Sequence, residues 1–410
     1  MVKYINKTSL IAIVIIFLAL RLTDFNQTMT SNWVAPYLSA AVNFDWSQFV
    51  LNVNMEEVKH FNQLSQSEYW EYEFNATNDP IQYDYLAKGL MMLVILAKKI
   101  FFFLGDLEAL QYLQYFAHIS LSIFVLTLFE KRYQKILFFI LYAINPLVLW
   151  VVNYPFYYFW QVIPSLIFVY WYLKKDIKFP LMIFFSAIFA FIYITRPTVL
   201  LLVVLFYALF AFKNNFKYAL IGFLVFFSLI SITPKLSIGP WHTMYVGIGA
   251  YENIYGIELS DKEGYKYYKE QTGKLVNSGN IMQEEVKKDY YKILKGRYLS
   301  IVEKDPLMII KHGVLNTVQA YGIGYSHSLN QKFGNKIIYL SVLIGLIVMG
   351  LLIYTKQYIL FLAIGLASGG FTLYYPPILT YMFGNFILLV VGVIGVVDYF
   401  IKQKNLKSIA

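Results

Sequence analysis

Apolar runs close to the length of a membrane span recur along this chain of 410 residues and limit what it can fold into. A helix needs roughly 20 mostly apolar residues to cross the hydrocarbon core of a bilayer. The runs that approach this length are 8–22, 110–129, 136–153, 157–173, 179–195, 197–212, 218–233, 336–354, 358–375 and 381–401. Only 14% of the residues are charged, whereas soluble domains carry roughly 25%. The sequence therefore predicts an all-α polytopic membrane protein with about ten transmembrane helices.

Two long polar stretches, 23–109 and 234–335, interrupt these runs and contain enough charged and turn-forming residues to lie outside the hydrocarbon. Lysine and arginine accumulate in cytoplasmic loops of membrane proteins. The cations of the short loops fall almost entirely on one side, at Lys3, Lys7, Lys131, Arg132, Lys135, Lys174, Lys175, Lys178, Lys213, Lys217, Lys356, Lys402, Lys404 and Lys407. The short loops of the other side contain only Arg196. We therefore expect both termini in the cytoplasm and both long stretches on the opposite face.

Residues 84–105 resemble a further span, but a crossing there would reverse the orientation of every later loop. Asp84, Lys88, Lys98 and Lys99 fall within an arc of about 100° on a helical wheel. A single charged stripe on an apolar helix is typical of a helix lying in the membrane interface. The segment 84–105 is thus predicted to be an interfacial helix within the first long stretch.

The chain then divides into three parts. Residues 1–233 form a membrane module that contains span one, read as uncleaved, the outer loop 23–109 and spans two to seven. Residues 234–335 form a second outer loop that is mainly helical, with helical periodicity over 281–316 and a break at Glu303-Lys304-Asp305-Pro306. Residues 336–410 form a module of three spans. The aromatic-rich segments 145–160 and 374–377 are interpreted as belts at the outer interface.

Composition also excludes several kinds of chemistry. The chain has no cysteine, so disulfides and thiolate nucleophiles are impossible. The net charge of +10 is explained by lysine clusters between apolar runs, so no nucleic acid partner is expected. The histidines His60, His118, His312 and His327 show no metal-ligand spacing. We expect neither a metal nor a cofactor.

Two carboxylates stand out in the first long stretch. Asp24 follows span one directly, and Asp45 lies in Asn43-Phe44-Asp45-Trp46 after an apolar segment. Apolar surroundings favour the neutral form of a carboxyl group and make its carboxylate more basic, which suits a general base. An ordinary helix cap or turn aspartate is an equally good interpretation of either residue.

Three basic residues are candidates for binding a phosphate. Arg196 occupies an outer loop against the charge bias, and the planar guanidinium group pairs well with phosphate oxygens. Snorkelling to lipid head groups is the alternative interpretation. Lys235 and His242 lie near the outer end of span seven, where they could meet a phosphate, but either one taken alone is more typical of a solvent-facing turn.

The order of these parts resembles the GT-C superfamily of membrane glycosyltransferases. In that superfamily a first span leads into a long outer loop with juxtamembrane helices, and six spans, a second long loop and a variable set of spans follow. Short segments are similar to bacterial members: Leu110-Gln111-Tyr112-Leu113-Gln114, Ala143-Ile144-Asn145-Pro146, Thr195-Arg196-Pro197 and the region from Trp241-His242 to Tyr255-Gly256. The resemblance covers about 330 residues in organisation and far fewer in sequence.

The resemblance implies a function in the bacterial inner membrane. A sugar would pass from a polyprenyl-phosphate donor to a glycan acceptor on the outer face, with inversion at the anomeric carbon, as in decoration of O-antigen or other surface polymers. By position, Asp45 or Asp24 would act as the base, and Arg196, Lys235 or His242 would stabilise the phosphate leaving group. Many members have paired acids after span one, whereas Phe25-Asn26 follows Asp24 here.

Two alternative functions remain. A polysaccharide polymerase or ligase acting on lipid-linked oligosaccharide has a similar number of spans, but its one long outer loop often carries several arginines, and 234–335 contains only Arg297. A lipid-linked sugar flippase, which is not an enzyme, is expected to place charged residues inside its spans. Such residues are almost absent here.

Overall fold

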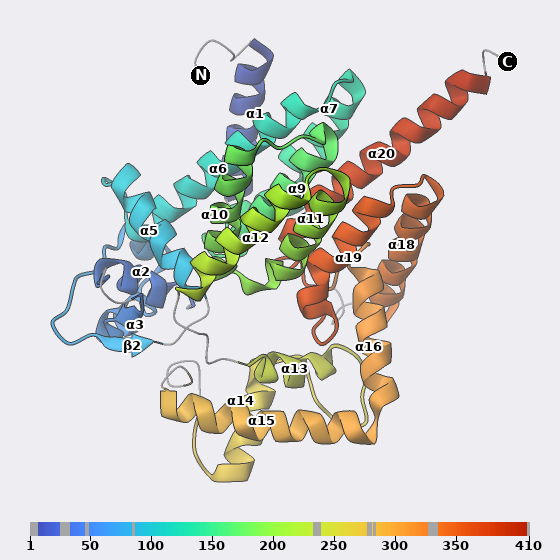
Figure 1. Ribbon diagram of the computed structural model, residues 1–410. Helices are drawn as coiled ribbons and strands as arrows, with labels where there is room; N and C mark the ends of the chain where they lie inside the picture. The colour runs from blue at the N-terminus through green and yellow to red at the C-terminus, as the bar shows by residue number, and fades with distance from the viewer. Residues whose placement is uncertain are drawn as a thin grey trace.

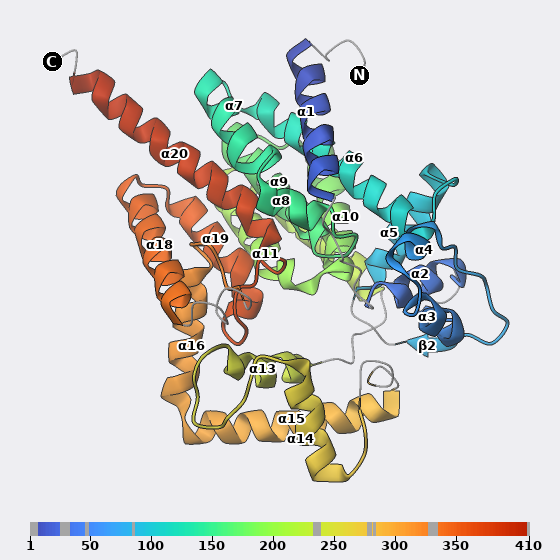
Figure 2. The same cartoon turned by 180° about the vertical axis from the view of Figure 1, so that it is seen from behind.

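The computed structural model describes residues 7–24, 33–45, 49–83, 87–232, 239–276, 281, 284–326 and 335–407. Most of these residues are helical, which confirms the predicted α class. A short antiparallel pair is the exception: β1 (Leu51–Val53) pairs with β2 (Ile81–Tyr83), with Leu51 opposite Tyr83. Figures 1 and 2 show a bundle of helices with two smaller parts attached near one of its ends.

Each predicted apolar run coincides with one helix or with two or three consecutive helical elements. The bundle contains α1 (Lys7–Asp24), α6 (Asp106–Leu128), α7 (Arg132–Phe138), η2 (Phe139–Ala143), α8 (Pro146–Val152), η3 (Phe159–Gln161), α9 (Val162–Lys174), α10 (Phe179–Thr195), η4 (Pro197–Val199), α11 (Leu200–Lys213), α12 (Phe216–Ser231), α18 (Asn335–Tyr354), α19 (Tyr358–Thr372) and α20 (Phe383–Lys407).

Among the described residues, three helices are long and apolar enough to cross a membrane: Asp106–Leu128, Lys336–Tyr354 and Phe383–Asn405. A bent pair, Arg132–Ala143 with Pro146–Val152, makes a fourth if it is one span. These helices indicate a membrane protein, while the count of ten crossings stays a prediction because several apolar helices are shorter than a bilayer requires.

The predicted span 136–153 is broken rather than straight, with an angle of 52° between its halves. The π-helical turn η2 ends at Ala143, and α8 restarts at Pro146. Asn145 caps the new helix by accepting a hydrogen bond from the Leu147 backbone nitrogen at 2.9 Å. Proline has no N–H to donate and clashes with the preceding turn, so it ends one helix and suits the first turn of the next.

We call residues 33–105 the first lobe. It contains α2 (Ala35–Val42), the two strands, α3 (Met55–Phe61), α4 (Gln66–Glu71) and α5 (Lys88–Ile100). Its small core is aromatic: the Phe61 ring lies 5.3 Å from Phe74, 5.7 Å from Tyr72 and 5.9 Å from Tyr69. Helix α5 packs on α2, α6 and α10 and so joins this lobe to the bundle.

The interfacial helix predicted over 84–105 is shorter, and its charged stripe does not face one surface. Lys88 is only 5% exposed, whereas Lys99 is exposed and Asp84 lies outside the described residues. Lys98 contacts Glu73 and the Leu104 carbonyl oxygen, each at 2.6 Å. The charged side chains of the predicted stripe therefore differ in exposure, because α5 packs against α2, α6 and α10.

We call residues 239–326 the second lobe. It contains α13 (Trp241–Gly247), η5 (Ile248–Ala250), α14 (Asp261–Thr272), α15 (Glu284–Lys304) and α16 (Pro306–Gln319). The predicted break at 303–306 is confirmed, since α15 ends at Lys304 and Asp305 caps α16 by accepting from the Met308 nitrogen at 3.0 Å.

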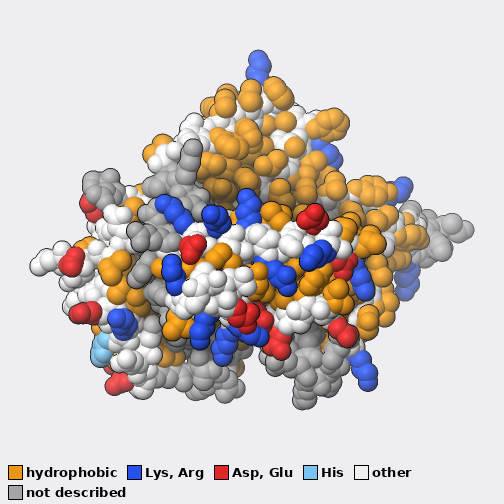
Figure 3. Space-filling model, turned by 90° about the horizontal axis from the view of Figure 1, so that it is seen from below, with side chains coloured by type: hydrophobic (Ala, Val, Ile, Leu, Met, Phe, Trp, Pro, Cys, Tyr) orange, Lys and Arg blue, Asp and Glu red, His pale blue; other side chains and the backbone are white. Residues whose placement is uncertain are grey.

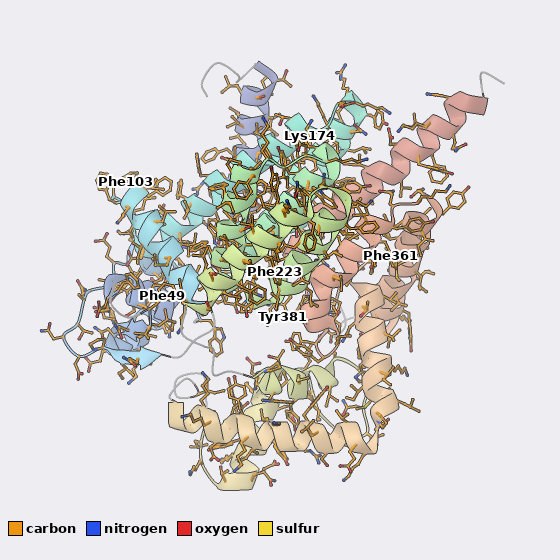
Figure 4. All side chains as sticks on the ribbon, in the orientation of Figure 1. Phe49, Phe103, Lys174, Phe223, Phe361 and Tyr381 are labelled. Carbon is orange, nitrogen blue, oxygen red and sulfur yellow. The ribbon has the colours of Figure 1, made fainter. Side chains whose placement is uncertain are left out.

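Both termini lie at one end of the bundle, and the second lobe lies across the other end (Figures 1 and 2). Helices α2 and α3 of the first lobe lie beside that same end. In Figure 4, Lys174 marks the half of the bundle nearer the termini and Tyr381 marks the end that faces α13. Seen from below, side chains of both charge signs are spread over the second lobe (Figure 3), as expected for a part of the chain outside hydrocarbon.

Candidate functional site

The structure describes the side chains of three of the five residues predicted to form a site. Asp24 is the last residue of α1, but its side chain lies outside the described part, as does Lys235 entirely. Asp45 is exposed in the first lobe, after α2. Arg196 and His242 lie in separate clusters, one at the end of the bundle and one in the second lobe.

Arg196 is enclosed by tyrosine rings. Its guanidinium carbon lies 4.6 Å from the ring centre of Tyr381, 5.0 Å from that of Tyr157 and 5.3 Å from that of Tyr158. Each cation–π contact contributes about 0.5–2 kcal/mol, depending on desolvation. We call Arg196 with these three tyrosines the tyrosine cage. In the snorkelling interpretation the guanidinium group would reach a lipid surface, whereas in the structure it lies among tyrosine rings.

The local sequence explains why Arg196 sits in this position. It is the C-cap of α10, and Pro197 follows it, so the helix ends there. The side chain of Thr195 turns back to the Phe191 carbonyl oxygen at 2.9 Å. Gly89 of α5 packs on the same turn so closely that a Cβ atom would lie 2.1 Å from the Thr195 Oγ1 atom. Helix α5 of the first lobe therefore packs directly against the turn that carries Arg196.

One guanidinium atom has no partner. The Nε atom of Arg196 is buried and makes no hydrogen bond with any described residue, and the same is true of the Nε atom of Arg297 in the second lobe. Rings attract the cation through their faces but do not accept hydrogen bonds as an anion does. Arg196 is half-buried, and desolvating a cation without an anionic partner is costly. The cage is therefore suited to a ligand that brings a negative charge.

The residues of the cage come from distant segments. Tyr157 and Tyr158 precede η3, whereas Tyr381 precedes α20. Gln161 joins the two segments by donating to the Thr380 carbonyl oxygen at 2.6 Å. The first predicted interfacial belt, 145–160, thus supplies two of the three cage tyrosines, whereas Tyr381 follows the second belt, 374–377, along the chain. Much of the first belt is buried, with Phe156 enclosed by its neighbours.

His242 has both ring nitrogens engaged within the second lobe. Its Nε2 atom lies 3.0 Å from Asp261 Oδ1, and its Nδ1 atom lies 2.5 Å from the Tyr290 hydroxyl. The hydrogen bond from His242 lowers the pKa of Asp261 and outweighs the opposing effect of burial. Direct contact between His242 and a phosphate therefore requires one of these bonds to be released.

The second lobe is fixed against the segment that carries Tyr381. Gly247 of α13 lies so close to Tyr374 that a Cβ atom would be 2.2 Å from the Tyr374 carbonyl oxygen. Further along, the Tyr325 backbone nitrogen donates to the Pro377 carbonyl oxygen at 2.8 Å. The neighbouring Tyr375 ring lies 5.4 Å from the Tyr381 ring, so the second lobe contacts the segment that completes the tyrosine cage.

Two groups in this region were not expected from the sequence. Asp261 and Tyr290 had no pattern to distinguish them from other loop residues, although the aromatic segments and the isolated Arg196 did offer a signal for the cage.

Arg297 of α15 also lies among tyrosine rings, as Arg196 does. Its guanidinium carbon is 5.5 Å from the Tyr267 ring centre and 5.8 Å from that of Tyr255.

A pocket lies away from both clusters. It has a volume of about 390 Å³ and is lined by residues of α2, α5, the segment 73–74 and the start of α6, including Lys98, Lys99 and Asp106. None of the predicted site residues lines it. Within the described part of the chain, no three His, Asp or Glu side chains are grouped as metal ligands.

The fold and the site together define a class: a helical membrane protein with a caged arginine at the end of its bundle that faces a docked helical lobe. Comparisons with models of protein families, with curated proteins and with solved structures each found no match.

Proposed function

We propose that this chain is a membrane glycosyltransferase that uses a polyprenyl-phosphate sugar as donor and a surface glycan as acceptor. The observation that carries the proposal is the tyrosine cage. It holds a cation against Tyr381, at the end of the bundle remote from the termini (Figure 4), with a buried Nε atom that no described residue satisfies. A phosphate anion joined to a lipid is a suitable partner, because its chain would remain in the bilayer while its head reaches the bundle end.

The order of the parts supports the same proposal. Helix α1 is followed by the first lobe, the bundle from α6 to α12, the second lobe, and then α18, α19 and α20. This order is what the GT-C resemblance implies, and both lobes lie near the same end of the bundle (Figure 1). A donor held at that end would have polar groups of both lobes around its sugar.

In the proposed reaction, a hydroxyl oxygen of the acceptor attacks the anomeric carbon of the donor sugar. The bond from that carbon to the phosphate oxygen breaks, the configuration inverts, and a carboxylate takes the hydroxyl proton. Arg196 stabilises the charge that develops on the phosphate, with Lys235 or His242 assigned the same role by the resemblance. Asp45 or Asp24 is the base that the resemblance assigns.

The proposal places the protein in the bacterial inner membrane with both termini in the cytoplasm. Donor and acceptor then meet on the outer face, where O-antigen and other envelope polymers are modified. The sided distribution of lysine and arginine supports this orientation.

Reconstitution in liposomes tests the proposal. The protein is supplied with a polyprenyl-phosphate monosaccharide and extracted surface glycan, and sugar transfer is measured together with binding of polyprenyl phosphate. Arg196→Lys keeps the charge but loses the planar fork, so we expect donor affinity and transfer to fall by a factor of about 10–100. Arg297→Lys is the matched control, because Arg297 also lies among tyrosine rings.

Other results would separate the alternatives. Growth of the lipid-linked glycan by whole repeat units would indicate a polymerase or ligase. Movement of the labelled donor across the membrane, without transfer, would indicate a flippase. Equal donor affinity in wild type and Arg196→Lys would remove the basis of the proposal.

A further inference from the structure

A row of three polar side chains in the second lobe leads from its interior to its surface. Tyr290 is fully buried, the His242 side chain is 16% exposed, and the Asp261 side chain is 53% exposed. The row is continuous, since His242 contacts Tyr290 at 2.5 Å on one side and Asp261 at 3.0 Å on the other. A buried tyrosine and a shielded histidine thus hold one outward carboxylate in place.

The packing around the row fixes its geometry. The Tyr265 ring stacks on His242 with centres 5.8 Å apart and an angle of 21° between the planes. Gly264 leaves room for the row: a Cβ atom there would lie 2.4 Å from the Tyr290 hydroxyl and 2.9 Å from His242 Nδ1. Asp261 itself begins α14, next to the cap residue Ser260. A carboxylate supported in this way loses little conformational freedom when it binds a ligand.

Packing contacts connect the row to the tyrosine cage. Helix α13, which carries His242, packs so closely on the segment 374–375 that a Cβ atom on Gly247 would lie 2.2 Å from the Tyr374 carbonyl oxygen and 3.2 Å from the Tyr375 ring. The Tyr375 ring lies 5.4 Å from the Tyr381 ring, and the Tyr381 ring centre lies 4.6 Å from the Arg196 guanidinium carbon. The helix that positions the row and the cation of the cage are therefore joined through one tyrosine segment, at the junction of bundle and lobe.

We propose that Asp261 is the carboxylate that binds the acceptor hydroxyl group and takes up its proton, with His242 and Tyr290 as positioning residues. This inference rests on the proposed function. As the acceptor oxygen bonds to the anomeric carbon, its proton passes to the Asp261 carboxylate, and the bond between the anomeric carbon and the donor phosphate oxygen breaks. The electron pair of that bond remains on the phosphate, beside Arg196. The aspartic acid then releases its proton to water.

Asp261 is in the charge state that this step needs. The hydrogen bond from His242 lowers the pKa of Asp261, so the carboxylate is a weaker base than an ordinary aspartate but is ionised throughout the neutral range. The positions of the two charges also suit the two substrates, because a donor phosphate is attracted to Arg196 while a neutral hydroxyl group donates to a carboxylate.

The test compares variants in the same liposome assay. Asp261→Asn keeps the shape and the contact with His242 but cannot accept a proton, so we expect transfer to fall by a factor of about 10²–10⁴ with unchanged binding of polyprenyl phosphate. Glu270→Gln, which removes an exposed carboxylate from the same helix, should transfer at the wild-type rate. His242→Asn should move the acidic limb of the pH–rate profile to higher pH, because Asp261 loses the hydrogen bond that lowers its pKa.

The outcomes separate this inference from the proposed function. Transfer by Asp261→Asn at the wild-type rate, with loss of transfer in Asp45→Asn or Asp24→Asn, would overturn the inference and leave the proposed function standing. Absence of transfer by the wild type from any polyprenyl-phosphate sugar would overturn both. Gly264→Ala provides a second route, since it displaces Tyr290 and His242 without changing a charge, and it should lower the maximal rate more than the donor affinity.

Discussion

The two lobes lie near the same end of the bundle but use their charged residues differently. Two carboxylates at the first lobe are engaged internally: Asp106, at the start of the adjoining α6, accepts from the Phe74 nitrogen at 2.8 Å and lies 3.6 Å from Lys98. Glu57 accepts from the Tyr72 hydroxyl at 2.7 Å and from Asn75. In the second lobe, a chain of contacts instead holds Asp261 outward. The first lobe behaves as a support for the bundle, whereas the second presents a charge to the junction.

Each lobe also contacts the bundle through one closely packed glycine. Gly89 of the first lobe packs on Thr195, next to Arg196, and Gly247 of the second lobe packs on Tyr374. Each contact is closer than any side chain permits. The tyrosine cage is therefore held between two lobe contacts, and each can be tested separately.

The largest effect is expected at the second of these contacts. In Gly247→Val, the new side chain meets the Tyr374 backbone, which cannot rotate away, so we expect a loss of about 3 kcal/mol in the free energy of docking. Transfer should fall strongly while the bundle remains folded. Hydrogen exchange measured by mass spectrometry should show faster exchange in the second lobe than in wild type.

A matched change in the first lobe sharpens the comparison. Gly89→Ala places a methyl group against the Thr195 side chain and should speed exchange near α5 and α10 instead. If Gly247→Val and Gly89→Ala gave the same exchange pattern, the two lobes would not be independent supports of the cage.

A smaller effect is expected from removing the buried carboxylate of Asp106, which lies at the start of α6 and contacts the first lobe. Asp106→Ala leaves the Phe74 N–H without its partner and Lys98 without one of its two acidic neighbours. A buried unsatisfied donor costs about 1–3 kcal/mol. We expect a lower thermal unfolding temperature with little change in donor affinity. A selective loss of donor binding would instead place Asp106 in the site.

The helices were more predictable than the site because the two depend on different kinds of information. A run such as 336–354 can be recognised from its sequence alone, since its residues are apolar all around the helix. The break at Pro146 is also local, although 136–153 was predicted only as one uninterrupted apolar run. Arg196 was recognisable as an isolated cation. Its cage was not, because Tyr157 and Tyr381 meet only after Gln161 joins two distant segments.

Asp261 is a clearer example of a site residue that the sequence alone does not reveal. Its neighbours along the chain, Ser260 and Lys262, are ordinary for a helix start. What distinguishes Asp261 is its contact with His242, which in turn contacts Tyr290. Along the chain, His242 lies 19 positions before Asp261, and Tyr290 lies 29 positions after it. Contacts over such distances are fixed by tertiary packing, so no local pattern indicates them.

A modest effect is expected from pH in the first lobe. Burial raises the pKa of Glu57, but the hydrogen bonds from Tyr72 and Asn75 outweigh it, and the pKa lies below the ordinary value of 4.5. A group whose folded pKa is lowered stabilises the fold above its unfolded pKa, and this stability is lost as the pH falls through the folded value. We expect the first lobe to loosen below about pH 4.5, seen as faster proteolysis. Glu57→Gln should lose this acid dependence.

The smallest effect is expected where the second lobe meets solvent. Lys295 of α15 lies 5.1 Å from the ring centre of Trp241, the first residue of α13. An exposed cation–π contact contributes about 0.5–1 kcal/mol, so Lys295→Met should lower the unfolding temperature slightly and leave transfer unchanged. Lys292→Met, one turn earlier on the same exposed face, is the control and should be neutral. Because α13 also carries His242, a loss of transfer in Lys295→Met without a change in stability would show that the outer surface of the lobe influences the row that ends at Asp261.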